Sequence, residues 1–153
     1  VLSPMSESNF ESLLIENQLC FPLYVCAKEW IKVYTPYLDE LGLTYTQFIT
    51  MMVLWEQKSL TVKELGKSLF LDSGTLTPLL KKLEEKGFVT RRRSLEDERN
   101  LIVTITEQGE ALKQRAIHIP RTVKEQIRIS PEDAEIIRGV LNRALAGLSG
   151  QIE

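Results

Sequence analysis

The chain has 153 residues, of which 43% are hydrophobic and 26% are charged, and its formal net charge is -2. This composition is typical of a globular domain and excludes a disordered chain. No apolar run approaches the roughly 18 residues of a membrane span, which excludes an integral membrane protein. Two cysteines are too few for a disulfide scaffold, and the near-neutral charge alone argues against a nucleic-acid partner.

The N-terminus shows no basic region followed by an apolar stretch, so we expect no secretion signal. We therefore expect a cytoplasmic protein whose two cysteines are thiols in a reducing compartment. Because the first methionine is Met5, residues 1–4 are expected to be additional to the natural chain. Residues 1–12 are expected to form an N-terminal arm.

A first helix is predicted from Leu13 to about Leu41, because apolar residues recur there at three- and four-residue steps. Pro22 and Pro36 interrupt this pattern. Proline removes an amide donor and clashes with the preceding turn, so we expect kinks or a break at both positions.

Two capping boxes mark the next helix starts. Thr44 and Gln47 have the required spacing before an apolar helix, and Thr61 and Glu64 repeat it before a short helix that ends near Leu69. In such a box the two side chains satisfy backbone amides that the first helical turn leaves free.

Asp72 and Ser73 open the following helix, which is predicted from about Thr75 to Lys86 and is stopped by Gly87. A proline is tolerated in the first turn of a helix, so Pro78 favours this start. The predicted buried face of the helix consists of Leu76, Leu79, Leu80 and Leu83.

The hydrophobic period then changes to that of strands. Residues 88–93 and 100–105 are rich in β-forming residues, and the charged segment 94–99 joins them, which predicts a two-stranded hairpin with a polar tip. Thr106 begins a helix that is predicted to reach about Ile119, before Pro120.

The last helix has a clear start, with a capping serine at Ser130, a proline at the first helical position and acidic residues in the first turn. Its predicted buried face consists of Ile136, Ile137, Val140, Leu141, Ala144, Leu145 and Leu148.

The order of helix, short helix, turn, capped helix and hairpin is the layout of a winged helix-turn-helix. The predicted fold is mainly α with a small β-hairpin. In this fold the second helix enters the major groove of DNA, and the hairpin tip reaches a neighbouring minor groove. The helix after Asp72 begins with small hydroxyl side chains suited to bases and phosphates, namely Ser73, Thr75 and Thr77.

The charge is unevenly distributed along the chain. Residues 58–93 contain nine lysines and arginines against four acidic residues, a net charge of +5, and the remainder carries -7. A basic block inside an acidic protein is the expected footprint of a local DNA-binding surface, although runs of basic residues also occur on ordinary solvated faces. The basic candidates are Lys81, Lys82, Lys86, Arg91, Arg92, Arg93 and, near the hairpin tip, Arg99.

Three segments resemble the MarR family of winged-helix regulators: residues 71–80 (LDSGTLTPLL), 87–89 (GFV) and 97–99 (DER). Residues 16–21 (ENQLCF) and Tyr24 resemble the OhrR-type organic-peroxide sensors within it. The resemblance covers roughly residues 14–119. It implies a transcriptional repressor that binds a pseudo-palindromic operator in double-stranded DNA as a homodimer with interlocking terminal helices.

The resemblance also implies roles for particular residues. Arg99, steadied by Asp97, would enter the minor groove. The residues facing the major groove would be Ser73, Thr75, Thr77 and Lys81. Residues 13–43 would form a dimerisation and sensor region, 44–105 the DNA-binding region, and 106–153 the C-terminal dimerisation helices.

In OhrR-type sensors the cysteine at the position of Cys20 reacts with peroxide. The resemblance implies that Tyr34 and Tyr45 of the partner subunit hydrogen-bond this sulfur and so favour the reactive thiolate. An organic hydroperoxide would oxidise Cys20 to a sulfenic acid, and a low-molecular-weight thiol would then form a mixed disulfide. Loss of the hydrogen bonds would change the spacing of the two DNA-reading heads and release the operator.

Helix geometry limits what Cys26 can do. Six residues on a continuous helix separate it from Cys20 by about 9 Å along the axis and roughly 240° around it. A disulfide needs α-carbons within about 7 Å, so an intrachain bridge requires the helix to unwind, for which Pro22 offers a break. Two-cysteine members of the family bridge to a cysteine near the partner's C-terminus, which this sequence lacks, so a one-cysteine mechanism is favoured.

Other interpretations remain open at this point. Both cysteines could be small buried hydrophobic residues, and Tyr34 and Tyr45 could be aromatic residues of a dimer core. The protein could be a MarR-type repressor released by a small ligand in the dimer cleft, or a helical adaptor that does not contact DNA. A thiol peroxidase needs a resolving thiol and a base near Cys20, which the sequence does not supply, so we expect no enzyme. His118 is the only histidine, and we expect no metal site and no cofactor.

Overall fold

The computed structural model describes residues 7–149. Residues 1–6, with half of the expected N-terminal arm, and residues 150–153 lie outside the described part. The elements in chain order are two short 3-10 helices (Glu7–Leu13 and Ile15–Asn17), α1 (Cys20–Leu41), α2 (Tyr45–Gln57), β1 (Ser59–Thr61), α3 (Val62–Leu69), α4 (Ser73–Glu85), β2 (Val89–Arg93), β3 (Leu101–Ile105), α5 (Glu107–Ala116), α6 (Ile119–Ile127) and α7 (Pro131–Leu148).

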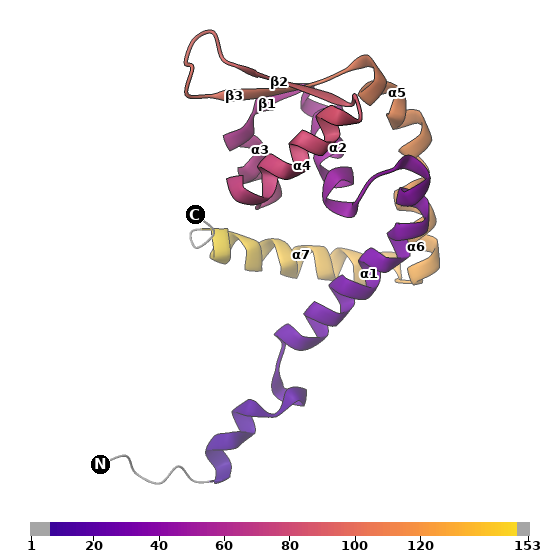
Figure 1. The fold of residues 1–153 in the computed structure, drawn as a ribbon. Coiled ribbons are helices and arrows are strands. Elements are labelled where there is room, and N and C mark those ends of the chain that lie inside the picture. Colours follow the sequence, from indigo (N-terminus) through magenta and orange to yellow (C-terminus); the bar gives the residue numbers. More distant parts are fainter. Residues whose placement is uncertain (1–6, 150–153) are drawn as a thin grey trace, which may run out of the picture.

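One lobe contains α2, α3, α4 and the sheet, and α1 extends away from it towards the N-terminus (Figure 1). Helices α5 and α6 lead from the sheet to α7, which lies below the lobe and crosses α1 in this view. Within residues 7–149 no helix is long and apolar enough to cross a membrane. The buried core joins the C-terminal end of α1 to the helices α2–α6 and the strands, and no residue of α7 is buried.

The long helix predicted from Leu13 is wrong over its first turns, because α1 begins only at Cys20. The side chains of Asn17 and Gln18 donate to backbone carbonyls, at 2.7 Å to Glu11 and 3.0 Å to Leu14, and so compete with helical bonding. Pro22 lies in the first turn of α1, where its missing amide hydrogen costs no helical bond. Of the kinks or breaks expected at the two prolines, a break is wrong at both, because α1 runs through Pro22 and Pro36 without interruption.

Both predicted capping boxes are confirmed. Thr44 accepts a hydrogen bond from the Gln47 amide at 3.3 Å, and the Gln47 side chain accepts one from the Thr44 amide at 3.0 Å. The same reciprocal pair, at 3.1 and 3.3 Å, joins Thr61 and Glu64 at the start of α3. These local contacts fix where the two helices begin.

Helix α4 begins two residues earlier than predicted, at Ser73. Asp72 causes this start, because its Oδ1 accepts a hydrogen bond from the Thr75 amide at 2.8 Å. Pro78 consequently lies inside the helix and not in its first turn. The predicted buried face is confirmed, and its four leucines, Leu76, Leu79, Leu80 and Leu83, are at most 7% exposed.

The predicted hairpin forms, with Val89 opposite Ile105 and Arg93 opposite Leu101. The hairpin belongs to a larger sheet, because β1, which was not predicted, adds a third antiparallel strand and the order is β1-β3-β2. Strand β1 is three residues long, so its sequence carries no alternating pattern, and its pairing of Leu60 with Val103 joins distant segments.

The helix predicted to reach Ile119 ends at Ala116, and α6 follows from Ile119. Pro120 lies in the first turn of α6, so it starts a helix that was not predicted. The start of α7 is confirmed, with Ser130 accepting from the Asp133 amide at 3.0 Å. Its predicted buried face is wrong for the single chain: Ile136 is 63% exposed, and the other large apolar residues of that face are also exposed.

Candidate nucleic-acid interface and thiol site

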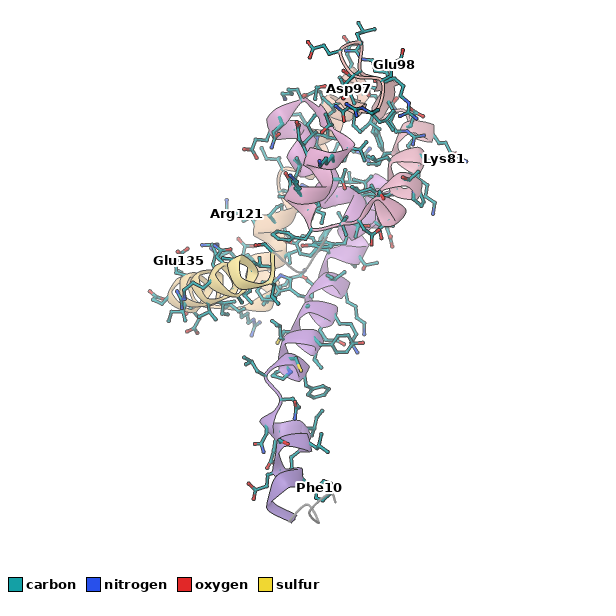
Figure 2. The ribbon with its side chains drawn as sticks, turned by 90° about the vertical axis from the view of Figure 1, so that its left-hand side faces the viewer. Phe10, Lys81, Asp97, Glu98, Arg121 and Glu135 are labelled. Carbon is teal, nitrogen blue, oxygen red and sulfur yellow. The ribbon has the colours of Figure 1, made fainter. Side chains whose placement is uncertain are left out.

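Helix α4 carries the residues predicted to face a major groove. Its capped N-terminal end leaves Ser73, Thr75 and Thr77 exposed. The Thr77 hydroxyl donates to the Ser73 carbonyl at 2.8 Å and keeps its lone pairs free to accept. Lys81 is exposed one turn later and projects from the helix (Figure 2). Because Ser73, Thr77 and Lys81 follow at four-residue steps, they share one face of α4.

The loop between β2 and β3 holds Arg99 in a fixed orientation. Nε and Nη2 of Arg99 donate to the two carboxylate oxygens of Asp97 at 3.0 and 3.1 Å, and the Arg99 amide adds a third bond at 3.1 Å. These bonds lower the pKa of Asp97 below its ordinary value and raise the pKa of Arg99. Asp97 and Glu98 lie at the far end of the hairpin (Figure 2), where the Arg99 side chain is 90% exposed.

Two basic residues of the +5 block are engaged elsewhere. The Arg91 side chain is only 20% exposed, and its backbone amide and Nη2 donate to Glu84 at 2.8 and 3.3 Å. Lys86 reaches the carbonyl of Gly42 and the side chain of Gln47. Arg91 thus ties β2 to α4, and the structure does not bring it to the same exposed surface as Lys81 and Arg99.

The cysteines are both free thiols with exposed side chains. Cys20 is the first residue of α1, and Cys26 follows six residues later on the same unbroken helix. The helix geometry that opposes an intrachain bridge therefore applies.

Tyr34 and Tyr45 are brought together by the packing of α1 on α2. Their ring centroids are 5.3 Å apart in an edge-to-face arrangement. Burial raises the pKa of both phenols, and for Tyr34 the neighbouring Tyr45 adds to the increase, so both hydroxyls are protonated donors at neutral pH. Cys20 is not part of this pair, because fourteen residues of helix place it about 21 Å from Tyr34 along the axis.

A cleft of about 410 Å³, which no pattern in the sequence indicates, lies between α1, α6 and α7. Trp30, Tyr34, Ile127 and Leu141 contribute apolar surface, and Lys124 and Arg138 are the cations of its lining. It suits a mainly apolar molecule that carries an anionic group. Across residues 7–149, no three His, Cys, Asp or Glu side chains gather where a metal ion could be held.

The chain is similar to known proteins over most of its length. It is 45% identical over 142 residues to the organic hydroperoxide resistance transcriptional regulator of Bacillus subtilis, covering 93% of this chain and 97% of the relative. It is 48% identical to the HTH-type transcriptional regulator SarZ of Staphylococcus aureus, covering 86% of this chain and 90% of SarZ.

The fold agrees with this similarity. The structure of reduced AbfR bound to DNA matches with a TM-score of 0.76 and 31% identity, covering 92% of this chain and 98% of AbfR, a protein of Staphylococcus epidermidis. Residues 32–116 match the family described as transcriptional regulator SarA/Rot. The chain therefore belongs to the SarA/Rot family of transcriptional regulators and is a winged-helix regulator of the MarR type.

Proposed function

We propose that the protein is a homodimeric transcriptional repressor that binds operator DNA in its reduced form and leaves it when an organic hydroperoxide oxidises Cys20. The 45% identity to the organic hydroperoxide resistance regulator carries this proposal. Two features support the proposal that the protein binds DNA. The capped start of α4 offers exposed hydroxyl groups, and Arg99 offers an oriented guanidinium on the hairpin of the same lobe. Such a repressor acts in the cytoplasm.

The proposed chemistry begins with the Cys20 thiolate, which attacks one peroxide oxygen. The O–O bond breaks, the alcohol leaves after taking up a proton, and the sulfur is oxidised by two electrons to a sulfenic acid. A low-molecular-weight thiol then condenses with the sulfenic acid, and water leaves as the mixed disulfide forms. The added group on sulfur would break hydrogen bonds from Tyr34 and Tyr45 of the second subunit.

The test compares the parent with Cys20→Ser and Cys26→Ser in fluorescence anisotropy on a DNA duplex enriched from a random library by the reduced protein. Cumene hydroperoxide should release the parent and Cys26→Ser but not Cys20→Ser. Mass mapping should locate the oxidation on Cys20. Release of Cys20→Ser by peroxide, or enrichment of no duplex, would contradict the proposal.

The cleft between α1, α6 and α7 supports a second candidate, a repressor released by a small ligand. Its apolar lining and the cation Lys124, beside Arg138 that already pairs with Glu135, favour an aromatic carboxylate. An aromatic carboxylate such as benzoate should then release both the parent and Cys20→Ser from DNA under reducing conditions. If only the Cys20-containing protein is released, and only by peroxide, the first candidate holds.

We propose further that peroxide is a signal and not a substrate turned over in bulk. Cys26 is poorly placed to resolve a sulfenic acid on Cys20, because both lie on the unbroken helix α1. Peroxide consumption should stop near one equivalent per Cys20 even when a low-molecular-weight thiol is present, because the mixed disulfide is the proposed end point. Sustained turnover coupled to a thiol would favour a peroxidase.

A further inference from the structure

Lys86 follows the last residue of α4 and reaches the junction between α1 and α2. Its ammonium donates to the carbonyl of Gly42 and lies 3.2 Å from Oε1 of Gln47. Gly42 ends α1 in the left-handed conformation, with φ of 68°, and Gln47 is only 3% exposed. The end of α1 concentrates negative partial charge on its carbonyls, so a cation is favoured there.

The acceptor used by Lys86 also belongs to the cap of α2. The same Oε1 of Gln47 accepts the hydrogen bond from the Thr44 amide at 3.0 Å. Tyr45 is the first residue of α2, two residues before Gln47, and its ring packs against Tyr34 of α1. A displacement of Tyr45 therefore acts on the helix cap that Lys86 contacts.

Helices α2 and α4 also contribute buried apolar side chains to one shared core. Apolar contacts are non-directional and tolerate sliding, whereas a charge-assisted hydrogen bond fixes an orientation. Lys86 thus gives the end of α4 a directional attachment to the α1–α2 junction.

We propose that Lys86 is a positioning residue that passes a displacement of Tyr45 and the α1–α2 junction to the recognition helix α4, and that it does not contact DNA. This inference rests on the proposed release by oxidation of Cys20. It separates Lys86 from Lys81, because the ammonium of Lys86, although the residue is exposed, donates to Gly42 and contacts Gln47 within the chain.

The test measures the DNA dissociation constant of the parent, Lys86→Met and Lys82→Met at several salt concentrations, before and after cumene hydroperoxide. The probe is the duplex enriched by the reduced protein. Lys82 is the matched control, since it is an exposed lysine four residues earlier on α4. We expect Lys86→Met to keep the parent's salt dependence and to reduce the oxidised-to-reduced ratio of dissociation constants by roughly threefold to tenfold.

Two further variants, Lys82→Met and Lys86→Arg, test whether the effect is specific to the charged donor at position 86. Lys82→Met should leave the ratio unchanged, and Lys86→Arg, which keeps a charged donor, should recover most of it. The inference is overturned if Lys86→Met leaves the ratio at the parent's value. It is also overturned if Lys86→Met lowers the slope of log affinity against log salt by about 0.9, the signature of a lost phosphate contact.

A peroxide-independent measurement separates this inference from the proposed function. If peroxide does not release the parent from DNA, the proposed function fails. A double-mutant cycle of Tyr45→Leu with Lys86→Met, measured on the reduced protein, then tests the role of Lys86 independently. Effects on the dissociation constant that deviate from additivity by more than about twofold support the attachment. Additive effects reject it.

Discussion

Asp97 holds the guanidinium of Arg99 through two parallel hydrogen bonds, so the orientation of the wing arginine depends on a neighbour two residues away. A bidentate carboxylate adds geometric specificity to an exposed ion pair. The pair is exposed, so its value lies in presenting Arg99 and not in the stability of the fold.

Replacing Asp97 by asparagine should weaken DNA binding about twofold to fivefold, because Arg99 loses one charged acceptor and samples other rotamers. The measurement is the dissociation constant of the reduced protein. Glu98→Gln is the control, since it removes the same charge at the next, exposed position without touching Arg99. Equal weakening by both variants would show that orientation is not the cause.

The pH dependence of the wing follows from the lowered pKa of Asp97. A carboxylate with a depressed pKa stays ionised, and keeps its ion pair, at every pH above that pKa. The pair is lost only as the pH falls through the depressed value. The Arg99 Nε–H signal in NMR should therefore stay protected from pH 7 down through about 4, the ordinary range of Asp, and broaden only below it. In Asp97→Asn the signal should show no such transition. A transition in the parent above about pH 4 would contradict the assignment.

For single side chains, the sequence predicts contacts between residues that are close in the chain. It does not predict contacts between distant segments. The pairing of Asp97 with Arg99 is local and is confirmed. Arg91 as a DNA contact stays a prediction, whereas its bond to Glu84 was not predicted and forms because β2 packs on α4. No pattern within either segment reveals that bond.

Helix α5 packs on the sheet at a point where only glycine fits. A Cβ on Gly109 would overlap the Phe88 carbonyl oxygen and lie 2.7 Å from Cγ1 of Ile105. The Gly109 carbonyl in turn accepts the buried indole bond of Trp55 at 2.8 Å. This close approach fixes how α2, α5 and the sheet pack against one another.

Gly109→Ala should lower the free energy of unfolding by about 1–3 kcal/mol, because the helix must move away from the sheet. Urea unfolding measures it. Gln114→Ala, at an exposed position of α5, should change stability by less than about 0.5 kcal/mol. A neutral Gly109→Ala would mean that α5 shifts freely.

The starts of α2, α3, α4 and α7 depend on side chains within three residues, so the sequence alone locates them to within two residues. Strand β1 and helix α6 depend on the rest of the fold. Residues 59–61 form β1 because β3 lies beside them. Pro120 lies at the start of α6, although the sequence suggested that it ends the preceding helix.

Within residues 7–149, one face of α7 presents exposed apolar side chains that no other element buries. Val140 is 48% exposed and Leu148 is 49% exposed, and α1 carries Tyr24 at 63% on its N-terminal half. The periodicity of α7 correctly predicted an apolar face. It could not show that the single chain leaves this face open, because amphipathic patterning does not say which molecule covers it.

Val140→Glu should convert the proposed dimer to monomer, since a carboxylate tolerated on the open face of one chain would be buried between two. Sedimentation velocity measures the change. Ala146→Glu is the control, because helical spacing places it opposite the apolar stripe and it is also exposed. If Val140→Glu remains dimeric, another surface holds the subunits together.

The separation of Cys20 from Tyr34 and Tyr45 within one chain has a genetic consequence. If each sensing site combines one subunit's sulfur with the other's phenols, a Cys20→Ser chain and a Tyr34→Phe, Tyr45→Phe chain can complement each other. Their mixed dimer contains one intact site and one site that lacks both halves. Cells carrying both defective alleles should therefore regain a partial peroxide response that neither allele gives alone, whereas a single allele with all three substitutions in one chain should give none.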